Sequence, residues 1–467
     1  MMKVQVCDAI CGKGKTSSCI NMMNSRTDTK FIFVTQFLSE VTRVKEACAS
    51  RGFVSPCNTD KNGKKKKDVT KLAVIQELIA AGENIVTTHS LFTSYTEKTL
   101  EMIRDQGYVL VLDEVVDVMK QADVTRSDLD LLRNGGAIEE FDDRIEWTDD
   151  YAMYEGRFRE EMLMARSKNF LMIDEECFYW AIPPELFTSF TEVYILSYMF
   201  HAQPLRCFFD SYGIEYELIG TRQVDGVYEF CPMEEMDRRE DLRDKIHIID
   251  TGKVNQIGGD RYALSYSWYK KARKEPGMPD LLRLKNNLSN VFKNVCKASV
   301  KEVMWTTYKD NIEVLSGKGY AGGFVPFNKR ATNEFASRRY LAYCVNSFPR
   351  PLERRYFSER GVEIDGDPQA LSTLVQWLFR SAIRNGEEVW IYIPSIRMRN
   401  LLIKWMDYLA EGRDLEPINY KTPRRSKATG AKRGRPPKCV TVKRKIEQER
   451  LERECTEQEQ NNENIVA

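Results

Sequence analysis

Histidine, paired cysteines and long apolar runs are scarce in this sequence. It holds 3 His and 12 Cys in 467 residues. The cysteines are scattered singly, without a Cys-x-x-Cys pair, which argues against a zinc site and favours reduced thiols. No apolar run approaches the roughly 20 residues that a membrane span needs, and no signal peptide is recognisable. We therefore expect a soluble, intracellular protein that does not contact membranes.

Net charge is nearly absent as well, since 70 basic and 69 acidic residues leave only +1. Its distribution is more informative than its sum. Residues 421–445 hold eleven Lys or Arg and no acid, whereas 447–459 carry six Glu and two Arg and are acidic on balance. The composition after residue 410 cannot build a core, so we expect 411–467 to be a disordered tail, basic and then acidic.

A phosphate-binding loop near the N-terminus is the strongest motif. A short strand is expected at 3–7 and a helix at 17–23. Glycines between a strand and a helix let backbone N–H groups converge on phosphate oxygens. Lys15 would then reach the β- and γ-phosphates, and Thr16 would hold Mg²⁺. The residues of this loop are Ala9, where the consensus has Gly, followed by Gly12, Lys13, Gly14, Lys15 and Thr16.

Two adjacent acids follow an apolar run at 109–112. Such a run predicts a central strand of a parallel sheet, which presents its next residues at the carboxyl edge where ligands bind. Asp113 would hold Mg²⁺ through water, and Glu114 would polarise an attacking water. Either motif alone could be structural, but both in this order indicate a nucleotide hydrolase.

The remaining pattern indicates an α/β protein with an interruption. Strands are expected at 31–36, 84–92, 169–173 and 194–200, and an acidic insertion at 119–166 is either a subdomain or a lid. A second α/β unit follows, with strands at 246–250, 302–306 and 388–394 and an apolar helix at 340–345. Its last helix carries Gln376, Arg380 and Arg384, which at a spacing of four would share one helix face.

These motifs resemble those of superfamily 2 DExD/H-type helicases. The loop reads Ala-x-x-Gly-x-Gly-Lys-Thr, and Asp113-Glu114 follows as in motif II. The chain is similar in style to the ATP-dependent DNA helicases of tailed phages, over residues 1 to about 410. The resemblance implies two RecA-like P-loop domains in tandem, 1–205 with motifs I to III and 206–410 with motifs IV to VI, and ATP with Mg²⁺ between them.

The resemblance also implies roles for residues outside the loop. Thr35, Thr88 and Thr332 match positions that contact nucleic acid, and Ser197 is placed as in motif III. Gln376, Arg380 and Arg384 resemble motif VI, although Phe379 replaces its Gly and the last Arg comes one position late. Which arginine would act as the finger on the γ-phosphate stays open.

Within the tail, residues 432–438 resemble an AT-hook. Its Arg-Gly-Arg-Pro centre is narrow enough for a minor groove, where Arg433 and Arg435 would contact A/T-rich duplex. The alternative is a charged tether without groove preference.

Three functions are compatible with this pattern. An ATP-dependent helicase or translocase, on DNA rather than RNA and with a single-stranded tracking strand in replication or recombination, accounts for most motifs. A terminase-like packaging motor would share the loop and the acid pair, but should carry a nuclease domain with clustered acids. A non-enzymatic DNA-binding protein acting through its basic tail would not need intact Lys15, Thr16, Asp113 and Glu114.

Overall fold

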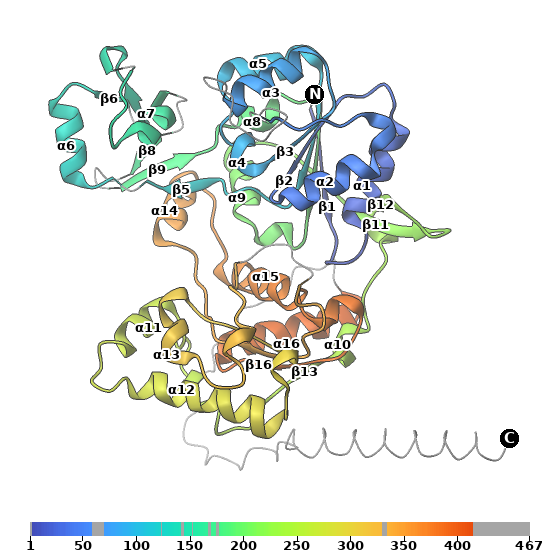
Figure 1. Ribbon diagram of the computed structural model, residues 1–467, viewed down its shortest axis with the longest axis vertical. Helices are drawn as coiled ribbons and strands as arrows, with labels where there is room; N and C mark the ends of the chain where they lie inside the picture. Colours follow the sequence, from blue (N-terminus) through green and yellow to red (C-terminus); the bar gives the residue numbers. More distant parts are fainter. Residues whose placement is uncertain are drawn as a thin grey trace. The chain divides into compact units, whose positions relative to one another are not determined.

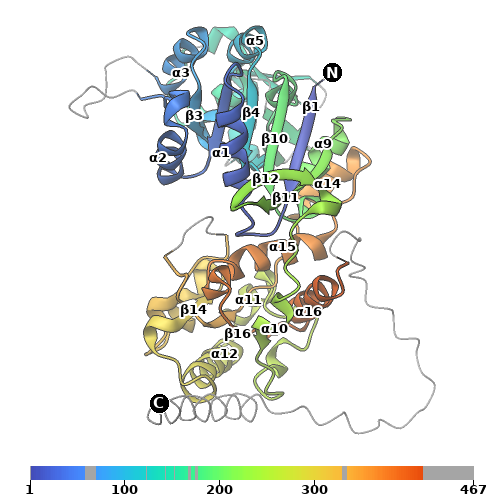
Figure 2. The same ribbon diagram turned by 90° about the vertical axis from the view of Figure 1, so that its right-hand side faces the viewer.

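The computed structural model describes residues 2–57, 70–122, 124–141, 144–151, 153–166, 170–173, 177–328 and 334–413 (Figures 1 and 2). The chain divides into two compact units. The first comprises Met1–Asp237 and Pro349–Asp365, and the second comprises Arg238–Phe348 and the chain from Gly366. This division falls at 237/238, later than the boundary at 205/206 that the sequence pattern suggested, because two further strands after residue 206 pair with the first sheet.

The first unit is built on a seven-stranded sheet of order β12-β11-β1-β10-β4-β2-β3. All neighbouring strands are parallel except β11 and β12, which form an antiparallel hairpin. Its strands are β1 (Lys3–Asp8), β2 (Phe31–Thr35), β3 (Ile85–Thr88), β4 (Val109–Asp113), β10 (Glu192–Ser197), β11 (Glu217–Val224) and β12 (Val227–Pro232). The predicted strands at 3–7, 31–36 and 109–112 are confirmed, whereas the one at 84–92 ends at Thr88.

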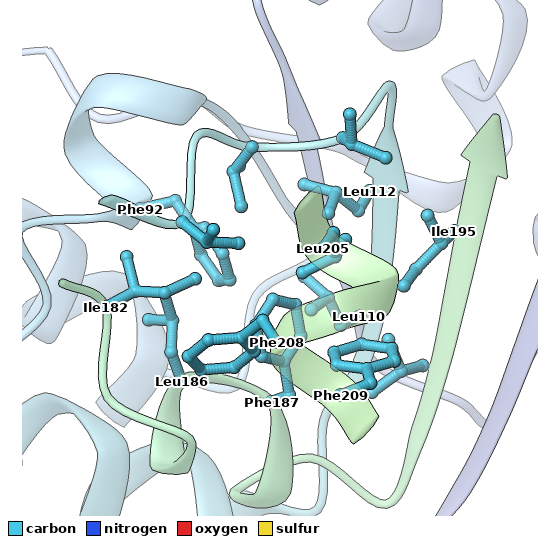
Figure 3. Packing of buried hydrophobic residues seen from close by; sticks show 14 of the residues in the cluster. Phe92, Leu110, Leu112, Ile182, Leu186, Phe187, Ile195, Leu205, Phe208 and Phe209 are labelled. Atoms are coloured by element: carbon cyan, nitrogen blue, oxygen red, sulfur yellow. The ribbon is translucent and has the colours of Figure 1, made fainter. Parts of the chain in front are cut away.

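Helices cover both faces of this sheet and give it two cores. One face packs Leu110, Leu112 and Ile195 against helical aromatics such as Phe187 and Phe208, as Figure 3 shows. The other face packs the alternate strand residues against α1 and α2. Burying each such side chain contributes about 1.5–3 kcal/mol. The helices are α1 (Lys15–Ser25), α2 (Leu38–Ala47), α3 (Lys71–Ala80), α4 (His89–Phe92), α5 (Glu97–Gln106), α8 (Glu185–Thr188), α9 (Pro204–Ser211) and α14 (Pro351–Glu359).

The insertion folds as a subdomain with a separate antiparallel sheet of order β5-β9-β8-β7-β6. It has a small core of its own, which includes Leu129, Ile145 and Trp147. Its elements are β5 (Met119–Gln121), α6 (Arg126–Asn134), β6 (Ile138–Phe141), β7 (Arg144–Trp147), α7 (Arg159–Arg166), β8 (Phe170–Ile173) and β9 (Cys177–Ala181). The prediction that 169–173 resumes the parallel sheet is therefore wrong, because β8 pairs with β7 and β9.

The second unit has a four-stranded parallel sheet of order β13-β16-β15-β14. Its core packs Trp305, Tyr392 and Leu284 between the sheet and the helices. Its elements are α10 (Leu242–Lys245), β13 (Ile246–Ile248), α11 (Tyr266–Ala272), α12 (Pro279–Asn290), a π-helix η6 (Val291–Val295), β14 (Val303–Thr306), α13 (Ile312–Leu315), β15 (Tyr340–Tyr343), α15 (Gly366–Leu378), a 3₁₀ turn η10 (Ala382–Asn385), β16 (Val389–Tyr392) and α16 (Ile396–Ala410).

Two predictions fail in the second unit. The sequence predicts a helix at 340–345, but Tyr340–Tyr343 form β15, because this short apolar run pairs with β14 on one side and β16 on the other. The helix expected to carry residues 376, 380 and 384 ends at Leu378. Over the described residues, none of the helices is long and apolar enough to cross a membrane.

Candidate functional site

The glycine loop lies at the carboxyl end of β1, directly before α1. Gly12 and Gly14 have φ of 85° and 73°, a left-handed conformation that favours glycine, and Gly14 caps the helix that begins at Lys15. Ala9 is fully buried, so the consensus glycine position is occupied by a small core residue. The loop therefore turns sharply enough for its backbone amides and the N-terminus of α1 to converge.

Lys15 bends back over this loop. Its Nζ donates to the carbonyl oxygens of Ala9 at 2.5 Å and Ile10 at 3.4 Å. The Lys15 ammonium group thus lies over the loop and is bonded only to uncharged carbonyls. A negatively charged phosphate chain would attract it more strongly than these carbonyls do. If Lys15 were replaced by a neutral residue, only the backbone dipoles of the loop would remain to attract a phosphate.

The structure brings Thr16 and Asp113 together from positions 97 residues apart. Thr16 Oγ1 donates to Asp113 Oδ1 at 3.3 Å, and Thr35 Oγ1 donates to Asp113 Oδ2 at 3.4 Å. Nε2 of His89 also lies 3.1 Å from the Asp113 carbonyl oxygen. Two hydroxyls and a carboxylate are hard oxygen donors, the type that Mg²⁺ prefers.

The electrostatic environment disfavours the charge on Asp113. Burial, and then the neighbouring carboxylates of Glu114 and Glu40, raise the pKa of Asp113 to about 7. The hydrogen bonds from Thr16 and Thr35 to Asp113 are both long, so they offset only a small part of the free-energy cost of ionising this buried carboxyl. A divalent cation at these oxygens would favour the carboxylate form instead.

Glu114 has an unusual backbone. Its φ is 68°, in the left-handed region that a residue with a side chain rarely adopts, and its N–H donates to the Leu196 carbonyl on β10 at 3.0 Å. This bond to the neighbouring strand fixes the turn after β4. Backbone strain of this kind is concentrated at functional sites.

Asp8, at the end of β1, belongs to the same edge, although sequence reasoning gave it no role. Its Oδ2 accepts from the Phe200 N–H at 3.0 Å, and its Oδ1 has no hydrogen-bond partner among the described residues. Burial raises the pKa of Asp8. Asp8 pairs in register with Ser197, the motif III candidate, so it ties the glycine loop to the segment after β10. Its position directly before the glycine loop is the one sequence feature that could have indicated a role for Asp8.

The β11–β12 hairpin also borders the loop, which the sequence did not indicate. Thr221 Oγ1 donates to the Lys13 carbonyl at 2.6 Å, and Asn21 Nδ2 of α1 donates to the Tyr228 carbonyl at 2.9 Å. The ring of Tyr228 lies so close to Gly14 that a Cβ there would come within 2.2 Å of it. These contacts join partners more than 200 positions apart.

Two of the five residues predicted to contact nucleic acid lie in the described part of the chain, and three do not. Thr35 and Thr88 are register partners at the ends of β2 and β3, so the structure brings them to one edge. Thr332, Arg433 and Arg435 lie outside the described residues, so their predicted roles stay predictions.

The motif VI candidates do not share a helix face, which corrects the prediction. Gln376 is in α15 and donates to Ser372 at 3.4 Å, but Arg380 follows the helix end and Arg384 lies in η10. Arg380 is buried, at 4% exposure, and its Nη1 donates to the Pro326 carbonyl at 3.4 Å, whereas Arg384 is exposed. After Leu378 the backbone continues in tighter turns, in which the N–H groups of Arg380 and Ser381 donate to the carbonyls three residues back, at 3.1 and 3.0 Å.

The fold and the family models together define a mixed α/β protein with parallel sheets and a Rossmann-like C-terminal domain. Residues 240–406 match the model of the YonV C-terminal Rossmann-like domain, and residues 119–180 match that of the YonV middle domain. The second match coincides with the antiparallel sheet β5–β9 and exceeds the predicted insertion of 119–166.

The chain belongs to the YonV family. It is 38% identical over 416 residues to the SPbeta prophage-derived uncharacterized protein YonV of Bacillus subtilis (strain 168), covering 87% of this chain and 99% of that one. The solved structure of S. tokodaii Xpd4 covers 88% of this chain and 94% of its own, at 12% identity and a TM-score of 0.42. A likeness at that level carries no conclusion about activity.

Proposed function

We propose that this protein is an ATP hydrolase that couples hydrolysis to movement along nucleic acid, as a helicase or translocase, with DNA favoured. The observation that carries the proposal is the 3.3 Å contact between Thr16 and Asp113. It joins the end of a glycine loop to the acid of a Val-Leu-Val-Leu-Asp-Glu strand end, two motifs that lie 97 positions apart in the sequence. If the Gly-Lys turn had arisen by chance, or if the acids had only a structural role, Thr16 and Asp113 would not need to be in contact.

Each residue of the site has a role in this proposal. Backbone amides of Gly12, Lys13 and Gly14, with the Lys15 ammonium, bind the phosphate chain. Ala9, whose N–H donates to the Ser197 carbonyl at 3.2 Å, shapes the start of the loop instead. Thr16 and Asp113 orient Mg²⁺, which when bound neutralises charge on the β- and γ-oxygens. Glu114 positions the attacking water and accepts its proton.

The finer expectations belong to the same proposal. Each unit is a RecA-like domain, Arg380 or Arg384 supplies positive charge to the γ-phosphate, and Gln376 assists nucleotide binding. Thr35, Thr88 and Thr332 contact a single-stranded tracking strand, and the tail binds duplex DNA through Arg433 and Arg435. A chain ending at Gly412 would then keep basal hydrolysis but lose duplex affinity, with a shallower dependence on salt.

One experiment tests the central claim and separates the alternatives. ATP hydrolysis by the full chain is measured alone and with single-stranded DNA, duplex DNA or RNA. Stimulation by a single strand supports a helicase or translocase, and stimulation by duplex alone supports a packaging-type motor. No hydrolysis under any condition, together with duplex binding that the tail accounts for, would leave a DNA-binding protein and overturn the proposal.

A further inference from the structure

The orientation of a nucleotide on the glycine loop follows from the order of the strands. Asp113 ends β4 and Glu114 follows it, and β4 lies two strands from β1 on one side, with β10 between them. The γ-phosphate end must point to these acids, so the ribose and base extend the opposite way. On that opposite side of β1 the sheet continues with β11 and β12, which Figure 2 shows beside α1.

An aromatic ring occupies this opposite side. Three ring carbons of Tyr228 lie 2.2–2.7 Å from the position that a Cβ on Gly14 would take, so the ring packs against the bare Cα of that glycine. Tyr228 is only half-buried. Among the described residues, no other aromatic ring or cation covers the Tyr228 ring, and no group bonds its hydroxyl. The ring therefore has one supported side and remains partly open to solvent.

The hairpin that carries the ring is held to the loop. The hydrogen bonds Thr221–Lys13 and Asn21–Tyr228, at 2.6 and 2.9 Å, fix β11 and β12 to the loop and to α1. The ring thus has a set position relative to the phosphate-binding amides, which lowers the entropy cost of stacking a ligand on it.

We infer that Tyr228 is a stacking platform for the nucleobase of the bound nucleotide. The inference rests on the proposed function, and it supplies the base contact for which the sequence offers no motif. Stacking on an aromatic face tolerates any base, because every base has a π-face. The site should therefore gain affinity from Tyr228 with little discrimination between adenine and guanine.

The test measures dissociation constants of the full chain for ADP, GDP and inorganic tripolyphosphate, each with Mg²⁺, by calorimetry. Tyr228→Leu keeps apolar packing on Gly14 but removes the ring, and Tyr228→Phe keeps the ring. Val227→Ala, at the exposed neighbouring position on the other face of β12, is the matched control. Thermal unfolding of each variant verifies that it is folded.

Tyr228→Leu should weaken ADP and GDP about tenfold, within the roughly 5- to 150-fold range for losing one base–aromatic stack. Tyr228→Phe and Val227→Ala should stay within about twofold, and tripolyphosphate, which has no base, should bind all variants equally. Unchanged or tighter ADP binding by Tyr228→Leu would overturn the inference, as would an equal loss for tripolyphosphate. Wild-type protein that binds ADP but never hydrolyses ATP would refute only the proposed function, whereas failure to bind ADP at all would refute both.

Discussion

The two parallel sheets differ in how the charged groups at their carboxyl edges are satisfied. In the second unit, all three guanidinium nitrogens of Arg397 donate hydrogen bonds, to Asp367 at 2.7 Å, Asn346 at 2.8 Å, the Ser347 carbonyl at 2.8 Å and the Gly366 carbonyl at 2.7 Å. Asn346 in turn donates to two loop carbonyls at 2.9 Å. This network is buried, with Arg397 at 8% exposure.

The edge of the first unit is the opposite case. Asp113 has only two side-chain contacts, of 3.3 and 3.4 Å, and one oxygen of Asp8 has no hydrogen-bond partner among the described residues. Burial raises the pKa of both carboxyls. Buried polar groups are ordinarily satisfied, because each unmade bond costs about 1–3 kcal/mol. Among the described residues both edges hold buried hydroxyls without a partner, such as Ser197 and Thr306, so the difference concerns the charged groups alone. The charge at the second edge is neutralised within its unit, whereas the carboxyls of the first edge would gain a partner from the proposed ligand.

The largest effect should come from the first edge. Lys15→Ala should abolish ATP hydrolysis, since it removes charge that binds the phosphates in both ground and transition states. Glu114→Gln should still bind ATP but hydrolyse it about 10²- to 10³-fold more slowly, because it acts on the water. Steady-state kinetics and equilibrium nucleotide binding check both variants.

Thermal unfolding verifies that both variants are folded, because Lys15 also donates to two loop carbonyls. Wild-type turnover in Glu114→Gln would show that the acid pair is misassigned.

The next largest effect should come from replacing Arg380 or Arg384. Arg380→Ala or Arg384→Ala should leave nucleotide affinity nearly intact and lower turnover by about two to five orders of magnitude, the range for an arginine finger. The exposed Arg384 should fold normally when replaced, whereas Arg380 is buried and bonds the Pro326 carbonyl. Turnover is therefore compared per folded molecule, with Arg380→Lys as the milder change. Near-normal turnover in both Ala variants would remove the finger from the proposal.

At the second edge the effect should be on stability alone. Arg397→Met removes the hydrogen bonds to buried Asn346, to the Ser347 carbonyl and to the half-buried Asp367, which keeps Arg261 at 3.9 Å. The change should cost about 1.5–3 kcal/mol and lower the melting temperature by about 3–12 °C. The control is Arg355→Met, whose exposed pair with Glu359 should contribute less than about 1 kcal/mol. Scanning calorimetry measures both. An unchanged melting temperature in Arg397→Met would contradict the distinction between the two edges.

Local patterns sufficed to predict much of the first edge. The run before the glycine loop alternates polar residues with valines, the run before Asp113 is apolar, and each ends at the residues that carry the chemistry. Their meeting could be anticipated because parallel strands present their carboxyl ends on one side. The same reasoning could not find Thr221, Tyr228 or the Asp8–Phe200 bond, since these join segments about 190 to 210 positions apart with no shared motif.

The failed predictions have local causes. The run Tyr340–Val345 is too short for its period to separate strand from helix, and burial between two strands decided the outcome. The end of α15 at Leu378 has no Gly or Pro nearby until Gly386, so nothing in the sequence marked it. The antiparallel sheet of the insertion depends on pairing between β5 and β9, about 60 residues apart, which periodicity cannot reveal.

The smallest effect should come from Thr35, which the resemblance assigns to nucleic acid and the structure places against Asp113. Thr35 is 1% exposed, and its hydroxyl donates to Asp113 Oδ2. Thr35→Val keeps the shape and removes one hydrogen bond worth about 1 kcal/mol, so hydrolysis should fall about fivefold with or without nucleic acid. Thr88→Val, its register partner on β3, is the matched control and should change only stimulation by nucleic acid. The opposite result would be weaker single-strand binding by Thr35→Val at an unchanged basal rate of hydrolysis. Thr35 would then belong to the surface that contacts the single strand, and it would not support Asp113 in the nucleotide site.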